Sequence, residues 1–242
     1  WKRVMHEVHL MGYESSAVAK ALATGNNNVV GLYAPRLGCA PSRSHEDAVF
    51  VSQLAESLRG RGYQLQLIGE LCRHTTIKTL DAIVTLDVDR ETFRKIGFNC
   101  FYPLICVDGL VDDPFLFYQV NNNFGRAAEF AGRHGSRAAL VFEPYAEQRL
   151  NERVCARFDA VCSSTGEVQL REFAAAQPEG TAFVAQGALL AERLRRMTAA
   201  AVLSMCPQGD IEVNARLKAR TTADLVVDTI CGQPPSEHDV LI

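Results

Sequence analysis

The sequence lacks the short motifs that identify the common enzyme classes. It has no Gly-rich phosphate loop, no Gly-x-Ser-x-Gly nucleophile elbow and no His-Glu-x-x-His zinc motif. Its eight cysteines are scattered, with no Cys-x-x-Cys pair and no Cys/His cluster, which argues against a zinc site. We therefore predict no catalytic residue, no metal and no cofactor.

Two further absences concern the surroundings of the protein. No apolar run is long enough to span a bilayer, so we expect no membrane partner. No signal peptide precedes the cysteines, which favours reduced thiols and a cytoplasmic location. The formal net charge is −3, whereas a protein that binds nucleic acid over most of its surface would be basic. Any contact with DNA must therefore come from a local segment.

What the sequence does contain is a repeated alternation of apolar strands and amphipathic helices. Predicted strands cover residues 29–34, 63–68, 81–86 and 104–107, with helices over 44–58 and 89–96 between them. The pattern recurs with strands at 137–142, 181–185, 202–205 and 240–242 and helices at 123–134, 148–163, 188–199 and 213–230. Such alternation favours right-handed crossovers and a parallel sheet covered by helices on both faces. We predict an α/β protein with two doubly wound parallel-sheet lobes joined by crossover strands.

The segment Leu10 to Pro35 combines the end of one helix, a short second helix, a polar break and the first buried strand. It resembles the corresponding part of LacI/GalR-family transcription regulators. The residues that carry the resemblance are Gly12-Tyr13, Ala19-Lys20-Ala21-Leu22, Thr24-Gly25 and Val30-Gly31-Leu32. Residues 103–108, 120–125, 152–158 and 219–232 resemble later segments of the same family. In residues 152–158, Arg153 stands at the arginine of the family's Arg-x-x-Gly-aromatic segment and Ala156 at its glycine.

The resemblance implies a type I periplasmic-binding-protein-like fold and a division of the chain into three parts. Residues 1–28 would be the end of the DNA-binding domain and the hinge helix, with Ala19, Lys20 and Leu22 at the hinge. Residues 29–118 plus 213–231 would form the N-terminal lobe. Residues 119–212 plus 232–242 would form the C-terminal lobe.

The same resemblance implies a ligand-responsive transcription regulator, a repressor that forms a homodimer and senses a small polar molecule such as a sugar or nucleobase. The family's first two DNA-reading helices would lie before Trp1, so we expect operator DNA to be bound only by the full-length protein. The sequence also departs from the family. Gln186-Gly187 and Met205-Cys206-Pro207-Gln208 replace segments that carry Asn and Asp there, so sugar recognition should be weakened or changed.

The candidate effector site follows from the topology. In open parallel sheets, ligands bind beyond the carboxyl ends of the strands, and in a two-lobed protein those ends face each other across a cleft. The residues selected in this way are Arg36, Ser42, Asp87, Asp108, Arg153 and Gln186. The resemblance adds that Asp108 and Arg153 hold the effector. The alternative for both is a salt bridge at the edge of the cleft.

Two other functions stay open on the sequence. Asp87 and Asp89 form an Asp-x-Asp pair that could hold a divalent metal in a nucleotide-sugar enzyme. Because Asp89 follows a strand and opens a helix, it is better interpreted as a helix cap. A solute-binding protein of similar fold is the other alternative, and the hinge segment argues against it.

Overall fold

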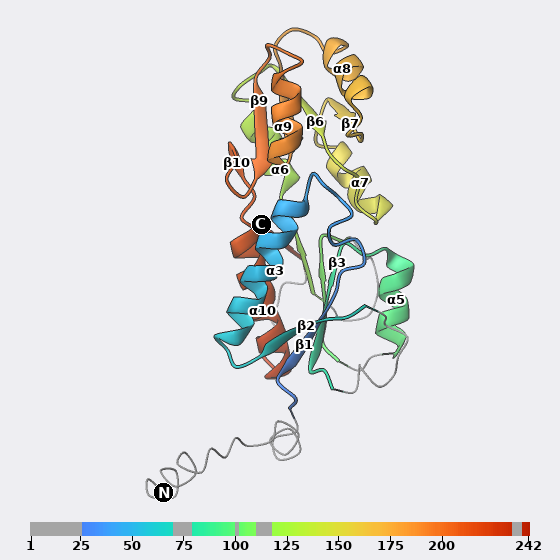
Figure 1. The fold of residues 1–242 in the computed structure, drawn as a ribbon, viewed down its shortest axis with the longest axis vertical. Coiled ribbons are helices and arrows are strands. Elements are labelled where there is room, and N and C mark those ends of the chain that lie inside the picture. Colours follow the sequence, from blue (N-terminus) through green and yellow to red (C-terminus); the bar gives the residue numbers. More distant parts are fainter. Residues whose placement is uncertain (1–25, 70–78, 100–101, 110–117, 234–238) are drawn as a thin grey trace, which may run out of the picture.

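The computed structural model describes residues 26–69, 79–99, 102–109, 118–233 and 239–242. They form two α/β lobes stacked along the long axis of the molecule (Figure 1). The predicted hinge residues Ala19, Lys20 and Leu22 lie outside the described residues. Within the described part of the chain, no helix is long and apolar enough to cross a membrane.

The first lobe, the lower one in Figure 1, is built on a six-stranded sheet with the order β11-β5-β4-β3-β1-β2. Its strands, all parallel, are β1 (Val29–Tyr33), β2 (Gln64–Leu67), β3 (Ala82–Leu86), β4 (Leu104–Val107), β5 (Tyr118–Asn121) and β11 (Asp239–Leu241). Helices α3 (Ser44–Arg59) and α10 (Ala215–Ile230) cover one face, and α5 (Arg90–Asn99) covers the other.

Side-chain alternation explains why both faces of this sheet are covered. Val30 and Leu32 of β1 pack among the residues of α3 and α10, whereas Ile83 of β3 packs with Ile96 of α5. All five residues of β3 are buried, as expected for a central parallel strand that carries helices on both sides. Burying one large aliphatic side chain of this kind stabilises the fold by about 1.5–3 kcal/mol.

The second lobe has a five-stranded parallel sheet with the order β10-β9-β8-β6-β7. Its strands are β6 (Arg137–Val141), β7 (Ala160–Cys162), β8 (Thr181–Gln186), β9 (Val202–Cys206) and β10 (Ile211–Glu212). Helices α6 (Phe124–Ala131) and α7 (Gln148–Cys155) pack on one face, and α8 (Glu167–Ala175) and α9 (Ala188–Arg195) pack on the other. The predicted fold of two doubly wound parallel lobes is confirmed.

The lobe boundaries differ from those expected. Strand β5 pairs with β4 and β11 pairs with β5, so residues 119–121 and 239–241 belong to the first sheet and not to the C-terminal lobe. The chain crosses between lobes just after β5 and again between β10 and α10. The backbone N–H of Asn123 donates to the carbonyl of Ile242 at 2.7 Å, which ties the first crossing to the residue after β11.

One predicted helix is also corrected. The apolar spacing of Leu150, Val154, Phe158 and Val161 predicted a single helix over 148–163, but α7 ends at Cys155 and residues 160–162 form β7. Val161 pairs with Leu140 of β6 in that strand. A three-residue strand is too short to show a period of two. Phe158 and Val161 continue the apolar spacing of the helix only by coincidence.

Candidate functional site

The carboxyl ends of the two sheets meet at the junction of the lobes, and the predicted residues Arg36, Ser42, Asp87 and Gln186 lie there. Each follows or ends a strand: β1 in the case of Arg36 and Ser42, β3 for Asp87 and β8 for Gln186. The structure thus brings these four together. It places Asp108 and Arg153 in two other settings, described below.

A buried arginine that the sequence analysis did not select occupies the centre of this junction. Arg43 is 2% exposed, and its guanidinium pairs with the carboxylate of Asp87 in the same lobe. The guanidinium carbon also lies 4.3 Å from the ring centroid of Tyr145 in the second lobe. Burial disfavours its charge, but the neighbouring Tyr145 and Asp87 raise the pKa of Arg43 above its ordinary value. A cation therefore sits permanently between the lobes.

Asp87 connects this cation to the second lobe. Its Oδ1 accepts a hydrogen bond from the backbone N–H of Ala146 at 2.8 Å. Its Oδ2 lies 3.4 Å from Nη1 of Arg36, whose Nη2 donates to the carbonyl of Pro144 at 3.1 Å. Two arginines of the first lobe thus share one carboxylate that is itself bonded to the second lobe.

Further contacts close the lobes against each other beside this cluster. The hydroxyl of Ser42 donates to Oε2 of Glu143 at 2.6 Å, and the backbone N–H of Arg90 donates to Oε2 of Glu147 at 2.8 Å. Gly187 touches the loop from β1 so closely that an added Cβ would lie 2.0 Å from the carbonyl oxygen of Ser42. This part of the predicted cleft is filled by the groups of the protein itself.

Gln186 is fully buried in the same region. Its Nε2 donates to the hydroxyl of Tyr145 at 2.8 Å, while its Oε1 has no hydrogen-bond partner among the described residues. Nε and Nη1 of Arg43 have none there either. Buried polar atoms of this kind cost free energy unless water or a ligand bonds them, so the junction retains binding capacity for a polar molecule.

Asp108 lies in a separate buried ion cluster. Nζ of Lys218, on α10, donates to Oδ2 of Asp108 at 2.8 Å and to Oε1 of Glu46 at 2.7 Å. Nδ2 of Asn122 donates to the same Glu46 oxygen at 2.8 Å. Lys218 is 1% exposed and Asp108 2%, so this cluster is shielded from solvent. The contacts of Asp108 are those of a buried salt bridge, and they favour this interpretation over direct binding of the effector by Asp108.

The titration of this cluster follows from burial and pairing. Burial raises the pKa of Asp108, and the attraction of Lys218 only partly offsets that effect. For Glu46 burial acts in the same direction, but Lys218 and the hydrogen bond from Asn122 outweigh it and lower its pKa. The two carboxylates raise the pKa of Lys218 despite its burial. The ammonium is the fixed charge around which the cluster is built.

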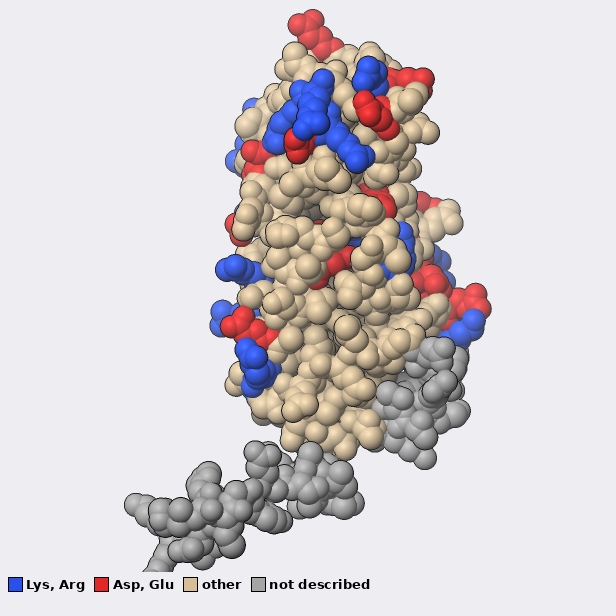
Figure 2. Space-filling model, in the orientation of Figure 1, with Lys and Arg blue, Asp and Glu red and all other residues tan. Residues whose placement is uncertain are grey.

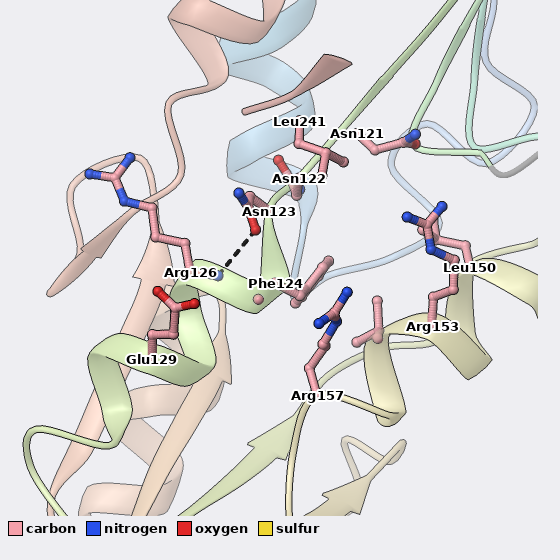
Figure 3. A pocket seen from close by; sticks show the side chains of 12 residues that line it. Asn121, Asn122, Asn123, Phe124, Arg126, Glu129, Leu150, Arg153, Arg157 and Leu241 are labelled. Atoms are coloured by element: carbon pink, nitrogen blue, oxygen red, sulfur yellow. Dashed lines mark hydrogen bonds between the residues drawn. The ribbon is translucent and has the colours of Figure 1, made fainter. Parts of the chain in front are cut away.

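Arg153 lines a pocket of ≈ 410 Å³ at the lobe junction. The first lobe contributes the ends of β5 and β11, and the second contributes the start of α6 and one side of α7. Figure 3 shows Arg153 and Arg157 extending into it from α7 and the turn that follows, toward Asn121 and Phe124. Arg126 lies on the far side of Asn123 in the same view. Three arginines line the pocket, Arg126, Arg153 and Arg157, together with one acid, Glu129; in Figure 3 Arg126 and Glu129 lie apart from the other two arginines.

The Asp-x-Asp pair does not form a metal site. Asp89 caps α5, since its Oδ1 accepts from the backbone N–H of Thr92 at 2.8 Å and its Oδ2 from the hydroxyl of Thr92 at 2.9 Å. The carboxylate of Asp87 pairs with Arg43 and Arg36 and accepts a hydrogen bond from the backbone N–H of Ala146. Across the described ranges there is no group of three His, Cys, Asp or Glu side chains that could hold a metal ion. The cap interpretation of Asp89 is confirmed.

The basic surface on α9 is engaged in pairs within its own lobe. Figure 2 shows lysine and arginine side chains gathered on the upper lobe, where α9 lies in Figure 1. Arg195 pairs with Asp210 at 2.7 Å, Arg196 pairs with Glu192, and Arg193 donates to the carbonyl of Thr165 at 3.0 Å. This arrangement is that of a solvated helix face.

Sequence reasoning missed five residues that pair at the junction: Arg43, Glu46, Asn122, Tyr145 and Lys218. It also missed Arg157, which lines the pocket. Glu46 stands in the first turn of a helix and Lys218 inside another, where charged residues are ordinarily on the solvent side. Arg157 stands four residues after Arg153, on the same face of the predicted helix over 148–163, but in the structure it lies in the turn after α7.

Comparison with known proteins gives similarity in structure only. No protein-family model and no curated protein sequence matches the chain. A lac repressor dimer bound to operator and the anti-inducer ONPF superposes with a TM-score of 0.68 at 13% identity, covering 95% of this chain and 96% of that one. A lac repressor bound to ONPG gives 0.70 at 13% identity, covering 100% and 87%. The regulator CelR in complex with cellobiose gives 0.63 at 16% identity, again covering 100% and 87%. The chain has the two-lobed fold of these three proteins.

Proposed function

We propose that this chain, which has the fold of the LacI/GalR-type repressors, is the effector-binding and dimerisation part of a ligand-responsive transcription regulator. The observation that carries the proposal is the polar pocket at the junction of two lobes whose strand ends face each other. Proteins of the same fold include an operator-bound repressor dimer and a regulator in complex with cellobiose. The ligand sensed here would be a small polar molecule such as a sugar or nucleobase.

Coupling between ligand and DNA would run through the closure of the lobes. Arg43 with Tyr145, and Ser42 with Glu143, stabilise the closed arrangement without a ligand. A ligand that contacts both lobes shifts the balance of open and closed forms by its differential affinity for the two. Arg153 contacts the ligand in this proposal, and Arg36, Ser42, Asp87 and Gln186 tune the closure. Asp108 acts through the Lys218 cluster and not by touching the ligand.

Residues 1–28 would join this sensor to the operator, with Ala19, Lys20 and Leu22 at the hinge. The regulator would work as a homodimer, because two hinges are needed to address a two-fold symmetric operator. Light scattering should give twice the mass of the chain at high micromolar concentration. A monomer at that concentration would contradict the dimer.

The proposal is tested in two steps. A thermal-shift screen of sugars and nucleobases should find a ligand that raises the melting temperature, since a ligand bound only by the folded state stabilises it. The full-length protein is then titrated with its operator in the presence and absence of that ligand. A ligand that leaves the operator affinity unchanged would refute a regulatory role. Manganese-dependent turnover of a nucleotide sugar would point instead to an enzyme.

A further inference from the structure

We propose that closure of the two lobes depends on a proton held by Asp47, which makes the lobe junction a pH-sensitive switch. The proton keeps the lobes closed, and its loss draws Arg43 away from the second lobe. The proposal concerns the regulation of the junction, and its bearing on operator binding rests on the proposed function. It follows from the charge balance of a buried cluster, the missing partner of Asp47 and the unused donors of Arg43.

The first observation is an excess of acids over cations among the buried charges at the junction. The start of α3 lies at the junction in Figure 1, and the ends of β3 and β4 and the first turn of α10 supply the other charges. The members of this cluster are each at most 5% exposed: Arg43, Glu46, Asp47, Asp87, Asp108 and Lys218. Arg36 adds one more cation at the edge, where a third of its side chain is exposed. With every group ionised, the acids outnumber the cations by one, and a buried excess charge is costly unless a proton neutralises it.

The second observation is that Asp47 lacks a partner. Asp87 pairs with two arginines, whereas Glu46 and Asp108 both pair with Lys218. Among the described residues, the carboxyl group of Asp47 has neither a hydrogen bond nor an ion pair. Burial raises the pKa of Asp47 to about 7 against the attraction of the nearby cations, and the charges of Glu46 and Asp108 add to the rise. Asp47 is therefore the acid to which we assign the proton.

Other titratable groups lie near Asp47 and must be separated from it. Burial raises the pKa of Asp108 as well, but both of its carboxylate oxygens accept hydrogen bonds from Nζ of Lys218, at 3.1 and 2.8 Å. Burial also raises the pKa of Tyr145, so its phenol keeps its proton at neutral pH. His45 stands on the same turn of α3 with an exposed side chain. Two further carboxylates of the junction accept hydrogen bonds from groups of the first lobe: Glu143 and Glu147.

The third observation is that Arg43 has donors that can turn toward Asp47. Its Nη2 pairs with Asp87, but its Nε and Nη1 are buried without a hydrogen-bond partner in the described part of the chain. Asp47 lies one turn later, and its backbone N–H donates to the carbonyl of Arg43 at 2.9 Å. Ionisation of Asp47 gives the guanidinium a second carboxylate within its own lobe. That carboxylate competes with the ring of Tyr145, whose centroid lies 4.3 Å from the guanidinium carbon in the second lobe.

The direction of the pH effect follows from linkage between proton binding and closure. The closed form keeps the proton on Asp47 up to about pH 7. Open lobes admit water to the cluster, so that Asp47 ionises at a lower pH, toward the ordinary value of about 4. Between these values the closed form binds more protons, and the ratio of open to closed molecules rises with pH by at most about tenfold per unit. Acid therefore closes the lobes and alkali loosens them.

Small-angle X-ray scattering and amide hydrogen exchange of the whole chain, at pH 5.5 and pH 8, test the proposal. We expect a larger radius of gyration at pH 8. The backbone N–H of Ala146, which donates to Asp87 across the junction, reports opening directly. Its exchange rate in the parent is divided by that in Asp47→Asn at the same pH, which cancels the intrinsic pH dependence of exchange. This ratio should grow about tenfold or more from pH 5.5 to pH 8, since one pKa unit is a factor of ten.

His45→Gln is the matched control, because histidine ordinarily changes its charge between pH 5 and pH 8 and His45 lies on the same turn of α3. This variant should keep the pH dependence of the parent. Asp108→Asn should keep it too, because its proton is not the one that controls closure. Circular dichroism at both pH values shows whether each variant is folded, and the exchange ratio decides where the change in radius is small.

Three results would overturn the inference. They are an exchange ratio that stays constant with pH, a radius of gyration that changes with pH equally in Asp47→Asn and the parent, and loss of the pH dependence in His45→Gln or Asp108→Asn. These outcomes differ from failure of the regulatory role. A ligand that changes operator affinity in a protein whose closure ignores pH refutes the switch alone. Closure that follows pH, in a protein whose operator affinity ignores every ligand, refutes the regulator alone.

Discussion

At the scale of single residues, the junction of the lobes is a set of buried charges held by neighbours of opposite sign. Arg43 and Lys218 are each almost fully buried, and each has a carboxylate within bonding distance. Asp47 is 5% exposed beside them, and its pKa is raised to about 7, mainly by burial and against the attraction of Arg43. The charge of Asp47 therefore changes near neutral pH.

The raised pKa of Asp47 predicts a pH-dependent effect of Asp47→Asn. Between about pH 4 and pH 7 the folded state keeps a proton that the unfolded state has lost, so the free energy of unfolding falls as the pH rises. Asn carries no charge at any pH and escapes this loss. We expect the variant to be more stable than the parent by roughly 2–4 kcal/mol at pH 8, at about 1.4 kcal/mol per pKa unit, and nearly equal at pH 4. Urea unfolding at both pH values measures it, and a pH-independent difference would contradict it.

Lys218→Met should be among the most destabilising single substitutions in the chain. It leaves the carboxylates of Glu46 and Asp108 buried together without their cation, which costs about 3–5 kcal/mol. Adding Asp108→Asn should recover part of the loss, since one of the two buried charges is then removed. Urea unfolding is the measurement. Lys95→Met is the control, because Lys95 and Glu91 form an exposed pair worth at most about 1 kcal/mol. Equal losses of stability for the two lysine substitutions would show that the buried cluster contributes no more than an exposed ion pair.

At the scale of elements, the start of α9 and the loop between β1 and α3 fit against each other across the junction. Gly187 precedes α9 with a φ of +94°, a conformation that residues with a side chain rarely adopt. The close approach of Ser42 leaves no room for a Cβ either. Glycine is required at this position for two separate reasons.

Gly187→Ala should therefore lower both the stability of the protein and the closure of the lobes. The backbone strain alone costs of order 1 kcal/mol, and the collision with the Ser42 carbonyl adds to it. Gly38→Ala measures the backbone strain alone, because Gly38 has a φ of +77° but nothing lies within 4 Å of an added Cβ. Thermal melting should show a clearly larger loss for Gly187→Ala. If the two variants melt alike, the contact with Ser42 does not constrain the junction.

At the scale of the whole molecule, the two lobes are held together by polar contacts of the junction in addition to the crossing segments. Arg43 extends from the first lobe to the ring of Tyr145 in the second. A small number of such bonds can set the balance between open and closed forms, since each is worth only a few kcal/mol.

Arg43→Met should open the molecule. It removes the cation between Asp87 and Tyr145 while keeping much of the side-chain volume. We expect the radius of gyration from small-angle X-ray scattering to rise relative to the parent. Arg133→Met is the control, because Arg133 packs over Phe130 within a single lobe, 5.8 Å from the ring centroid. An unchanged radius of gyration for Arg43→Met in a folded protein would show that other contacts determine closure.

The sequence by itself determined most of the elements and the class of fold, although it did not separate β7 from α7 or predict α8. Apolar strands such as 81–86, the helices between them and the cap at Asp89 all depend on residues within a few positions of one another. The alternation then restricts the topology, because parallel strands joined by helices have few right-handed arrangements. The likeness of fold to the LacI/GalR-type repressors was also predictable from short matches in the right order.

Only the tertiary structure decided which strand-end side chains line the pocket and which neutralise one another. From their position near strand ends, Asp108 and Arg153 were both predicted to bind the effector. In the structure Asp108 is buried against Lys218, 110 positions away, whereas Arg153 lines the pocket. Lys218 reaches Glu46 across 172 positions, and β11 completes a sheet begun at β1. Local sequence patterns hold no information on such pairings, because they arise when whole elements pack and a buried charge must have a partner of opposite sign.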